Sequence, residues 1–312
     1  MSNAQWIWQY VKQYKGKIAL ATLFLIGNAI LIVINPYLGK MVVDQVIYKN
    51  EVNLLIPLIA IMIGTTLVRT IMRYSYQILW ERVGQNTIFQ LREDMYKKLQ
   101  ELDFDFFNHT RVGDIMARMT GDTDAIRHFV SWVIYNIMEC VIWFMAAVAV
   151  MAFINWKLML ALVAVTPVIF LMTNGMGKKA RPLFFEIRES FSRLNSMVEE
   201  NIGGNRVVKA FAREDFEIEK FNGYNDDFKQ RNMASAKVTR TYLPVLDGLA
   251  GSLGAITLIF GGALCIQGTM TIGDLVAFNG YLWMLNNPMR MAGWLINDVQ
   301  RFSAACIKIR QM

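Results

Sequence analysis

The sequence predicts an all-α membrane protein: six transmembrane helices with long helical extensions on the cytoplasmic side. Hydrophobic residues make up 54% of the 312 residues and charged residues only 18%, whereas soluble domains average about 25% charged residues. The apolar residues also fall in runs of about 20, the length that crosses a hydrocarbon core about 30 Å thick. We therefore expect residues 1–312 to form a single transmembrane domain.

The first predicted element is a short amphipathic helix at residues 5–16. Trp6, Tyr10 and Tyr14 recur every four residues, and lysines follow them. Aromatic residues beside lysines are typical of the membrane interface, although the same pattern also fits the ordinary flank of a first span. The first span is predicted at residues 18–38.

The second predicted span, 54–76, continues without a break into a water-exposed helix. Charged residues appear after Val68, yet apolar residues keep helical spacing and Gly84 is the only helix breaker on the way. A helix of about 50 residues is about 75 Å long, much longer than a bilayer is thick. Residues 77–128 are thus the predicted first stalk, with turn-forming Asn108 and Gly113 in its middle.

The second half of the chain repeats this plan. A minimal turn at Asn155–Lys157 separates the third span from the fourth, and apolar residues three and four apart predict long helices beyond it. Gly203 and Gly204 interrupt that spacing within the charged stretch 199–221. The remaining predicted elements are the third span 129–154, the fourth span 158–177, the second stalk 178–240, the fifth span 242–266, the sixth span 274–294 and a last stalk helix 295–312.

The distribution of positive charge predicts the orientation. Residues 81–130 contain seven lysines and arginines and residues 178–240 contain thirteen, against three in the short connections on the opposite side. Because positively charged connections stay in the cytoplasm, we expect a multi-pass protein of the cell membrane with both stalks and both termini cytoplasmic. The net charge of +7 is explained in this way, and no nucleic-acid partner is expected, because aromatic platforms interleaved with basic residues are missing.

Several kinds of chemistry lack the residues that they need. The sequence contains no G-x-x-x-x-G-K-[ST] phosphate-binding loop, so this chain alone is not expected to hydrolyse ATP. Two histidines and no H-E-x-x-H pattern leave no basis for a metal site. The cysteines Cys140, Cys265 and Cys306 lie in helical sequence and are interpreted as small buried hydrophobic residues. No catalytic residue is predicted.

Polar residues inside the spans are the candidate substrate contacts, because they are costly in lipid. Each asparagine could equally hydrogen-bond a neighbouring helix, and Glu139 could pair with a stalk arginine. Arg69 and Arg73 are interpreted as the point where the second helix leaves the lipid. With this mixed polarity, an amphipathic drug, a lipid and a peptide all remain possible substrates. The candidates are Asn28, Asn35, Glu139, Asn174, Asn279, Asn286 and Asn287.

Together with six spans and two stalks, several motifs identify a resemblance that covers essentially the whole chain. The strongest are Gly203-Gly204 through Val208-Lys209-Ala210-Phe211-x-x-Glu214-x-x-Glu217-x-x-x-Phe221, and Phe107 followed by Gly113-Asp114, Arg118 and Asp122. Weaker ones are Pro36 through Asp44, Gly273-Asp274-Leu275 and Pro288. In these features the chain resembles the transmembrane domain of ATP-binding cassette (ABC) exporters of the multidrug and lipid-flippase type, type IV.

The resemblance implies how the domain would be driven. Each stalk would end in a short coupling helix that docks on an ATPase domain, the first around 111–117 and the second around 208–214, with Phe211 as its apolar anchor. The implied contact residues are Arg111, Val112, Gly113, Asp114, Val208, Phe211, Ala212, Arg213 and Glu214. The ATP-binding domain is expected after residue 312, fused or as a separate subunit, and ATP and Mg²⁺ would bind there; this chain itself would bind no cofactor.

The resemblance also implies the partners and the mechanism. A second transmembrane domain, identical or not, would complete a dimer in the lipid bilayer, and the dimer would move a small amphipathic, lipid or peptide substrate by alternating access. Two other classes share the helical architecture: a secondary carrier or channel, and a membrane scaffold that transports nothing.

Overall fold

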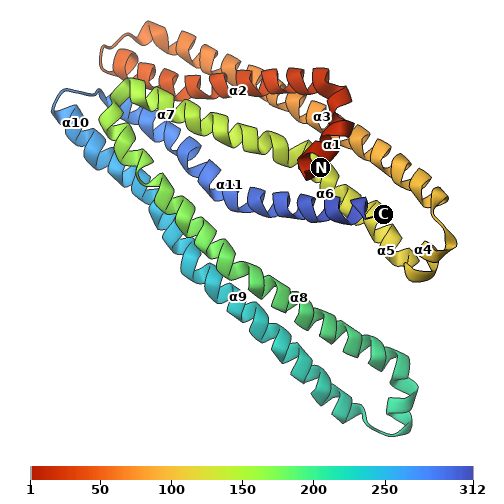
Figure 1. Ribbon diagram of the computed structural model, residues 1–312. Coiled ribbons are helices and arrows are strands. Elements are labelled where there is room, and N and C mark those ends of the chain that lie inside the picture. Colours follow the sequence, from red (N-terminus) through yellow and green to blue (C-terminus); the bar gives the residue numbers. More distant parts are fainter. Residues whose placement is uncertain (1, 312) are drawn as a thin grey trace. The chain divides into compact units, whose positions relative to one another are not determined.

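A computed structural model of the protein describes residues 2–311, and within that range all regular structure is helical. The chain divides into two compact units (Figure 1). Residues up to Thr166 together with those from Leu253 onward form unit 1, and Pro167–Ser252 form unit 2. Short 3-10 or π-helical segments, named η, interrupt or join the α-helices. In chain order the elements are α1 Asn3–Val11, η1 Lys12–Tyr14, α2 Lys15–Met41, η2 Val42–Ile47, η3 Val52–Leu54, α3 Leu55–Glu101, α4 Phe104–His109, α5 Val112–Ala117, η4 Arg118–Asp122, α6 Thr123–His128, η5 Phe129–Val133, α7 Ile134–Val163, α8 Thr166–Ala210, α9 Glu214–Ile256, η6 Thr257–Gly261, α10 Gly262–Ile266 and α11 Ile272–Arg310.

Within residues 2–311, four helical stretches are long and apolar enough to cross a membrane, judged by length and composition. They are Asn3–Ile47, Val52–Glu101, Val112–Ala210 and Glu214–Ile266. The third of them is 99 residues long and holds both the third and the fourth predicted span, because the chain reverses within it.

That reversal lies at Asn155, where the sequence predicts a turn. Asn155 has extended backbone angles (φ −157°, ψ 107°) inside the range of α7. Its side-chain Oδ1 accepts hydrogen bonds from the backbone N–H groups of Lys157 (3.0 Å) and Leu158 (3.1 Å). Asn155 therefore caps a new helix.

The uninterrupted helix expected after the second span is present as α3, which is 47 residues long. Its apolar stripe, including Val83, Ile88 and Leu91, is buried in a cluster with residues of α1, α6, η5 and α11. Gly84 is required for this packing, because a Cβ at that position would lie 2.7 Å from Cβ of Ser131 in η5. The first stalk is thus built into the core of unit 1.

Helix α1 contributes to the same core. Ile7 and Val11 are buried in the cluster, and Trp6, Tyr10 and Tyr14 pack against it. Burial and the neighbouring Asp94 carboxylate raise the pKa of Tyr10 to about 12. The aromatic face that the sequence assigns to the membrane interface is therefore turned toward protein.

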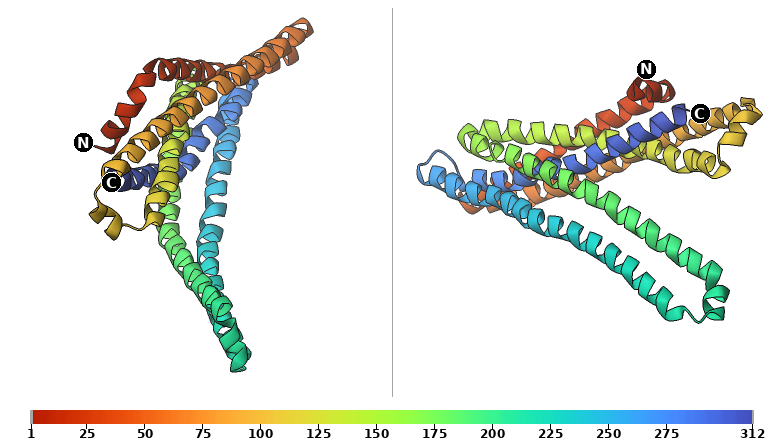
Figure 2. Two further views of the ribbon diagram at one scale, coloured as in Figure 1. Left: turned by 90° about the vertical axis from the view of Figure 1, so that its right-hand side faces the viewer. Right: turned by 60° about the horizontal axis from the view of Figure 1, so that its bottom comes forward.

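Unit 2 is a helical hairpin, in which α8 and α9 lie side by side and meet at a short loop (Figures 1 and 2). Its helices are joined by the tilted ring pair Phe191–Phe228, with centroids 5.4 Å apart, and by polar contacts. Ser190 Oγ donates to Asp227 Oδ2 at 2.6 Å, and Arg231 Nη1 pairs with Glu186 Oε2 at 2.6 Å. This hairpin contains the predicted second stalk.

Candidate functional site: the stalk tips and the polar residues of the spans

The tip of the first stalk is formed by α4 and α5. Asp103 begins α4 by accepting a hydrogen bond from the backbone N–H of Phe106 at 3.2 Å, and Ile115 anchors α5 by its burial. The four candidate docking residues, Arg111 to Asp114, are all exposed, and Val112 exposes 73% of its surface. The tip thus offers an apolar side chain between charged ones, on a short helix where the resemblance implies one.

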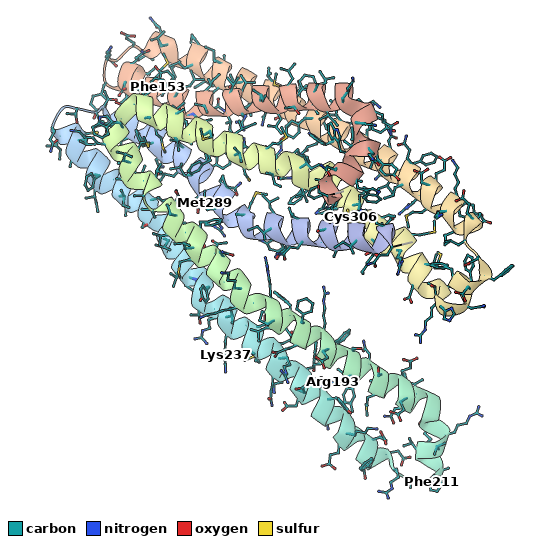
Figure 3. All side chains as sticks on the ribbon, in the orientation of Figure 1. Phe153, Arg193, Phe211, Lys237, Met289 and Cys306 are labelled. Atoms are coloured by element: carbon teal, nitrogen blue, oxygen red, sulfur yellow. The ribbon has the colours of Figure 1, made fainter. Side chains whose placement is uncertain are left out.

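The tip of the second stalk is the turn between α8 and α9 (Figure 3). Phe211, labelled there at the end of the hairpin, exposes 75% of its surface. The N–H of Arg213 donates to the carbonyl of Val208 (3.0 Å) and the N–H of Ala212 to that of Lys209 (3.2 Å). This is a Schellman motif, and Ala212 holds its left-handed position at φ 47°.

The second-stalk docking residues therefore span three local structures. Val208 belongs to the last turn of α8 and is half-buried, Phe211 to Arg213 form the exposed turn, and Glu214 begins α9. The Arg213 guanidinium stands over the ring of Phe216, 5.9 Å from its centroid. A free aromatic ring with charged neighbours is the kind of surface that inserts into a partner's groove.

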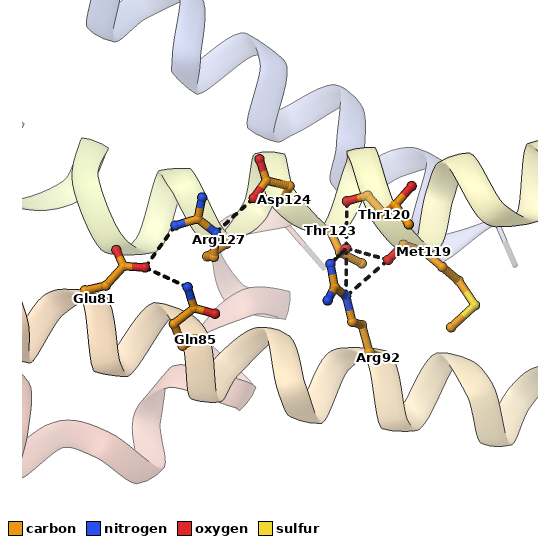
Figure 4. Close-up of polar contacts among 8 residues, drawn as sticks. All are labelled: Glu81, Gln85, Arg92, Met119, Thr120, Thr123, Asp124 and Arg127. Atoms are coloured by element: carbon orange, nitrogen blue, oxygen red, sulfur yellow. Dashed lines mark hydrogen bonds and ion pairs between the residues drawn. The ribbon is translucent and has the colours of Figure 1, made fainter.

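Side chains fix the first stalk laterally (Figure 4). Nε of Arg92 in α3 donates to the carbonyl oxygen of Met119 at 3.1 Å and to Oγ1 of Thr123 at 3.2 Å. Four residues after Thr123, Arg127 bridges Glu81 (3.0 Å) and Asp124 (2.9 Å). Arg92 through a backbone carbonyl, and Arg127 through two carboxylates, thus cross-link α3 to the returning segment η4–α6.

The candidate substrate contacts fall into different environments. Asn35 hydrogen-bonds α2 to α3: its Oδ1 accepts from the hydroxyl of Thr65 (2.8 Å) and its Nδ2 donates to the hydroxyl of Thr66 (3.0 Å). Asn28 is buried, Asn279 is exposed, and Asn286 and Asn287 lie half-buried in α11. Asn174 lies in unit 2, half-buried. Asn286 Oδ1 is a buried acceptor without a hydrogen-bond partner among the described residues.

Glu139 is held by a span residue, not by a stalk arginine. Its side chain is 4% exposed, and its Oε1 accepts a hydrogen bond from Oη of Tyr76 at 2.9 Å. Tyr76 is fully buried in α3 and meets the ring of Tyr135 edge-on. The charges of Arg73 and Arg69 in the second span act on this carboxylate. The carboxylate is thus part of a polar cluster inside the apolar part of unit 1.

Sequence reasoning missed a contact that joins the first span to the sixth. Asp44 accepts hydrogen bonds from Oγ1 of Thr271 (2.7 Å) and from the backbone N–H of Gly273 (2.9 Å), at the start of α11. Lys40 pairs with Asp274 at 2.6 Å. A Cβ on Gly273 would lie 2.5 Å from the Asp44 carboxylate. The motif from Pro36 through Asp44 and the motif Gly273-Asp274-Leu275 are each visible in the sequence, but nothing in the sequence shows that they are in contact.

A pocket of about 770 Å³ opens beside this contact, lined by Tyr37, Lys40, Asp44 and residues of the 265–272 connection. Two charged residues inside the last two predicted spans, Asp247 and Arg290, were also missed, and both are exposed. A scan for charge in every predicted span, and not only in the second and third, would have found them.

The most informative relatives are bacterial ABC proteins. The chain is 27% identical to the multidrug resistance-like ATP-binding protein MdlA of Escherichia coli, over 99% of the chain and 52% of MdlA. It is also 27% identical to the ABC transporter ATP-binding protein YknU of Bacillus subtilis, over 96% of the chain and 50% of the relative. The ATP-dependent lipid A-core flippase of Desulfotalea psychrophila is likewise 27% identical, over 95% of the chain and 52% of its own length.

The chain thus spans about half the length of these relatives. Its long apolar helices are those of a multi-pass membrane protein. Residues 18–289 match the family described as the ABC transporter transmembrane region. This chain belongs to that family.

Proposed function

We propose that this chain is the membrane-crossing, substrate-translocating part of an ATP-driven exporter that works by alternating access. Six spans cross the bilayer, and both termini and both stalks are cytoplasmic. Membership of the ABC transmembrane family supports the transport role, and relatives named for multidrug resistance and for lipid A-core flipping support export of an amphipathic, lipid or peptide substrate. The excess of lysine and arginine in the stalks supports the orientation.

The observation that carries the proposal is the exposed Phe211 at the tip of the second stalk. A partner that covers this phenylalanine gains the free energy of burying its apolar surface. We assign that partner as an ATPase domain, fused or separate, which binds ATP and Mg²⁺; the residues around Val112 at the first tip dock in the same way. A second transmembrane domain, identical or related, completes the transporter.

ATP binding is coupled to transport through contacts that differ between the two states of the membrane domain. ATP can shift the domain between inward and outward states only as far as the docked tips interact better with one state than with the other. The long helices α3, α8 and α9 connect the tips to the spans. Because a helix is stiff over this length, movement of a tip is passed to the membrane part.

The test is Phe211→Ala in the complete transporter, reconstituted with its ATPase domains. Loss of the apolar anchor is expected to reduce ATP-driven transport by about tenfold or more while ATPase activity persists, as for a hot-spot residue worth about 2 kcal/mol. Phe211→Leu, which keeps an apolar side chain, should restore most of the transport. Phe185→Ala is the matched control, since Phe185 is 71% exposed on α8 but far from the tip.

Unchanged transport in Phe211→Ala would contradict the docking assignment. The orientation is tested separately with single cysteines placed at positions 108 and 212 in a cysteine-free background. Reagents that cannot cross the membrane should label both only from the cytoplasmic side. Labelling from outside would overturn the topology.

A further inference from the structure

The outward face of α1 carries exposed lysines that lead into the first span. Trp8, Lys12 and Lys15 are exposed and follow one another at spacings of four and three. These spacings place them on one side of the chain, because residues four apart share a side of an α-helix and side chains three apart eclipse each other in a 3-10 segment such as η1. Ile7 and Val11 on the other side of α1 are buried in the core of unit 1. The face with Trp8 and the lysines is therefore turned away from that core.

The same side of the chain continues through the first span as exposed apolar residues. Within α2, Lys15 is followed by Ala19, Leu23, Ile26 and Ile30 at spacings of four, four, three and four, and all of them are exposed. Exposed leucine and isoleucine on a membrane span are covered by lipid tails. Because the lysines stand just before this stripe, they lie at the level where the headgroups of those lipids are expected.

The positive charge on this face has no acidic partner. The sequence contains no aspartate or glutamate before Asp44. The acidic residue beside α1, Asp94 of α3, lies next to Tyr10 on the side that packs on protein. Three lysines of this segment form no ion pair with any of residues 2–311, and we call them the basic band: Lys12, Lys15 and Lys17.

We infer that the basic band binds the headgroups of anionic phospholipids in the cytoplasmic leaflet. Each lysine beside an anionic bilayer strengthens binding by about fivefold, and an exposed tryptophan such as Trp8 favours the headgroup level. Lys17 is placed by Tyr14, since its Nζ stands 5.4 Å from the centroid of that ring. A lipid fits this surface better than an acidic protein does, because the band merges into an apolar stripe. The inference goes beyond export and takes from the proposed function only the cytoplasmic position of α1.

The experiment places the complete transporter in phosphatidylcholine nanodiscs without ATP. A fluorophore on Ala19→Cys, in a cysteine-free background, reports nearby lipids that carry a nitroxide close to the headgroup. Nitroxide-labelled phosphatidylglycerol should reach half-maximal quenching at a mole fraction about tenfold lower than labelled phosphatidylcholine. The reference position is Ile56→Cys at the start of α3, where the side chain is 79% exposed and both lipids should quench equally.

Variants test whether the lysines cause the preference. Lys12→Gln combined with Lys15→Gln should reduce the preference for phosphatidylglycerol by about tenfold or more. Lys12→Arg combined with Lys15→Arg should keep the preference, because both charges remain. The matched control is Lys97→Gln combined with Lys98→Gln, which also removes two exposed lysines, but each of these pairs with a glutamate within the first stalk. This control should leave the preference unchanged.

Three outcomes would overturn the inference. The first is equal quenching by the two lipids at position 19, and the second is a loss in the control variant as large as in the variant of the basic band. The third is displacement of phosphatidylglycerol by soluble glycerol phosphate, because the ligand would then be a free anion. Since no ATP is present, none of these outcomes bears on export, which the transport assay of Phe211→Ala tests separately.

Discussion

The two stalks have similar apolar spacing in the sequence, but they are stabilised differently. The stripe of α3 in the first stalk is buried against α1 and α11, from the two ends of the chain, and against α6 and η5. Within unit 2 the second stalk is only α8 packed on α9, and much of its apolar surface, such as Phe191, stays exposed. The first stalk is therefore part of a hydrophobic core, whereas the second has one helix–helix seam with the polar contacts of Asp227 beside it.

Helical periodicity thus predicts a helix but not how firmly the helix is held by its neighbours. Packing in several layers makes the first stalk rigid, because its buried side chains meet neighbours from more than one direction. A two-helix hairpin has one seam, so its local opening costs less. Four pairs of substitutions test this comparison.

The largest expected effect is at Phe302, which is 4% exposed in the first-stalk cluster and stacks on Phe129 with ring centroids 3.7 Å apart. Phe302→Ala should lower the free energy of unfolding by about 3–5 kcal/mol, because a large cavity remains. Phe191→Ala, at a residue 48% exposed in the second stalk, should cost about 1 kcal/mol or less. Thermal unfolding in detergent measures both, and equal shifts in melting temperature would remove the distinction.

A smaller effect is expected where α3 meets η5. Gly84→Ala forces a methyl group onto Cβ of Ser131, 2.7 Å away, and should destabilise the domain by about 1–3 kcal/mol through overpacking. Gly64→Ala is the control on the same helix, because nothing lies within 4 Å of its added Cβ. A control variant that melts earlier than Gly84→Ala would show that close approach is not the cause.

The third prediction concerns the tip of the second stalk. Ala212 occupies the left-handed position of the Schellman motif at φ 47°, which costs a residue with a side chain about 1 kcal/mol. Ala212→Gly should therefore slow hydrogen exchange in the turn that joins α8 to α9. The reverse substitution, Gly268→Ala at φ 71°, should destabilise the connection after α10, because it places a side chain in the left-handed region. If both changes acted in the same direction, strain at these positions would be disproved.

The smallest effect is a pH dependence of the second stalk. The hydrogen bond from Ser190, followed by the hydrogen bond and charge of Arg231, holds the pKa of Asp227 below its usual range. Because this pKa is depressed in the folded state, its stabilisation is complete above the usual carboxyl pKa of about 4 and is lost as the pH falls through the lower folded value.

Acidification from about pH 5 to pH 3 should therefore increase proteolysis of the α8–α9 hairpin. Asp227→Asn should flatten that dependence, while Asp226→Asn, at the exposed neighbouring residue, should not. The same slope in both variants would exclude Asp227 as the titrating group. Higher salt should weaken the effect, since the site is open to solvent.

Much of the fold could be predicted from hydropathy and periodicity alone. The continuous α3, the turn at Asn155 and the exposure of Phe211 all agree with expectations from the sequence. The face of α1 was assigned to the membrane interface but packs on protein, because an aromatic stripe is equally suited to a lipid surface and to a neighbouring helix. Which of the two it meets depends on segments far away in the chain.

Hydropathy and periodicity predict the helical architecture, the placement of charge in the stalks and the apolar tips, because each depends on the transfer of short segments between water and lipid. Which polar side chains meet is visible only in the folded protein: Asp44 with the start of α11, and Tyr76 with Glu139 beside two arginines. Those pairings depend on how each helix is rotated and shifted against its neighbour. The periodicity of a single helix leaves both quantities open, and packing fixes them.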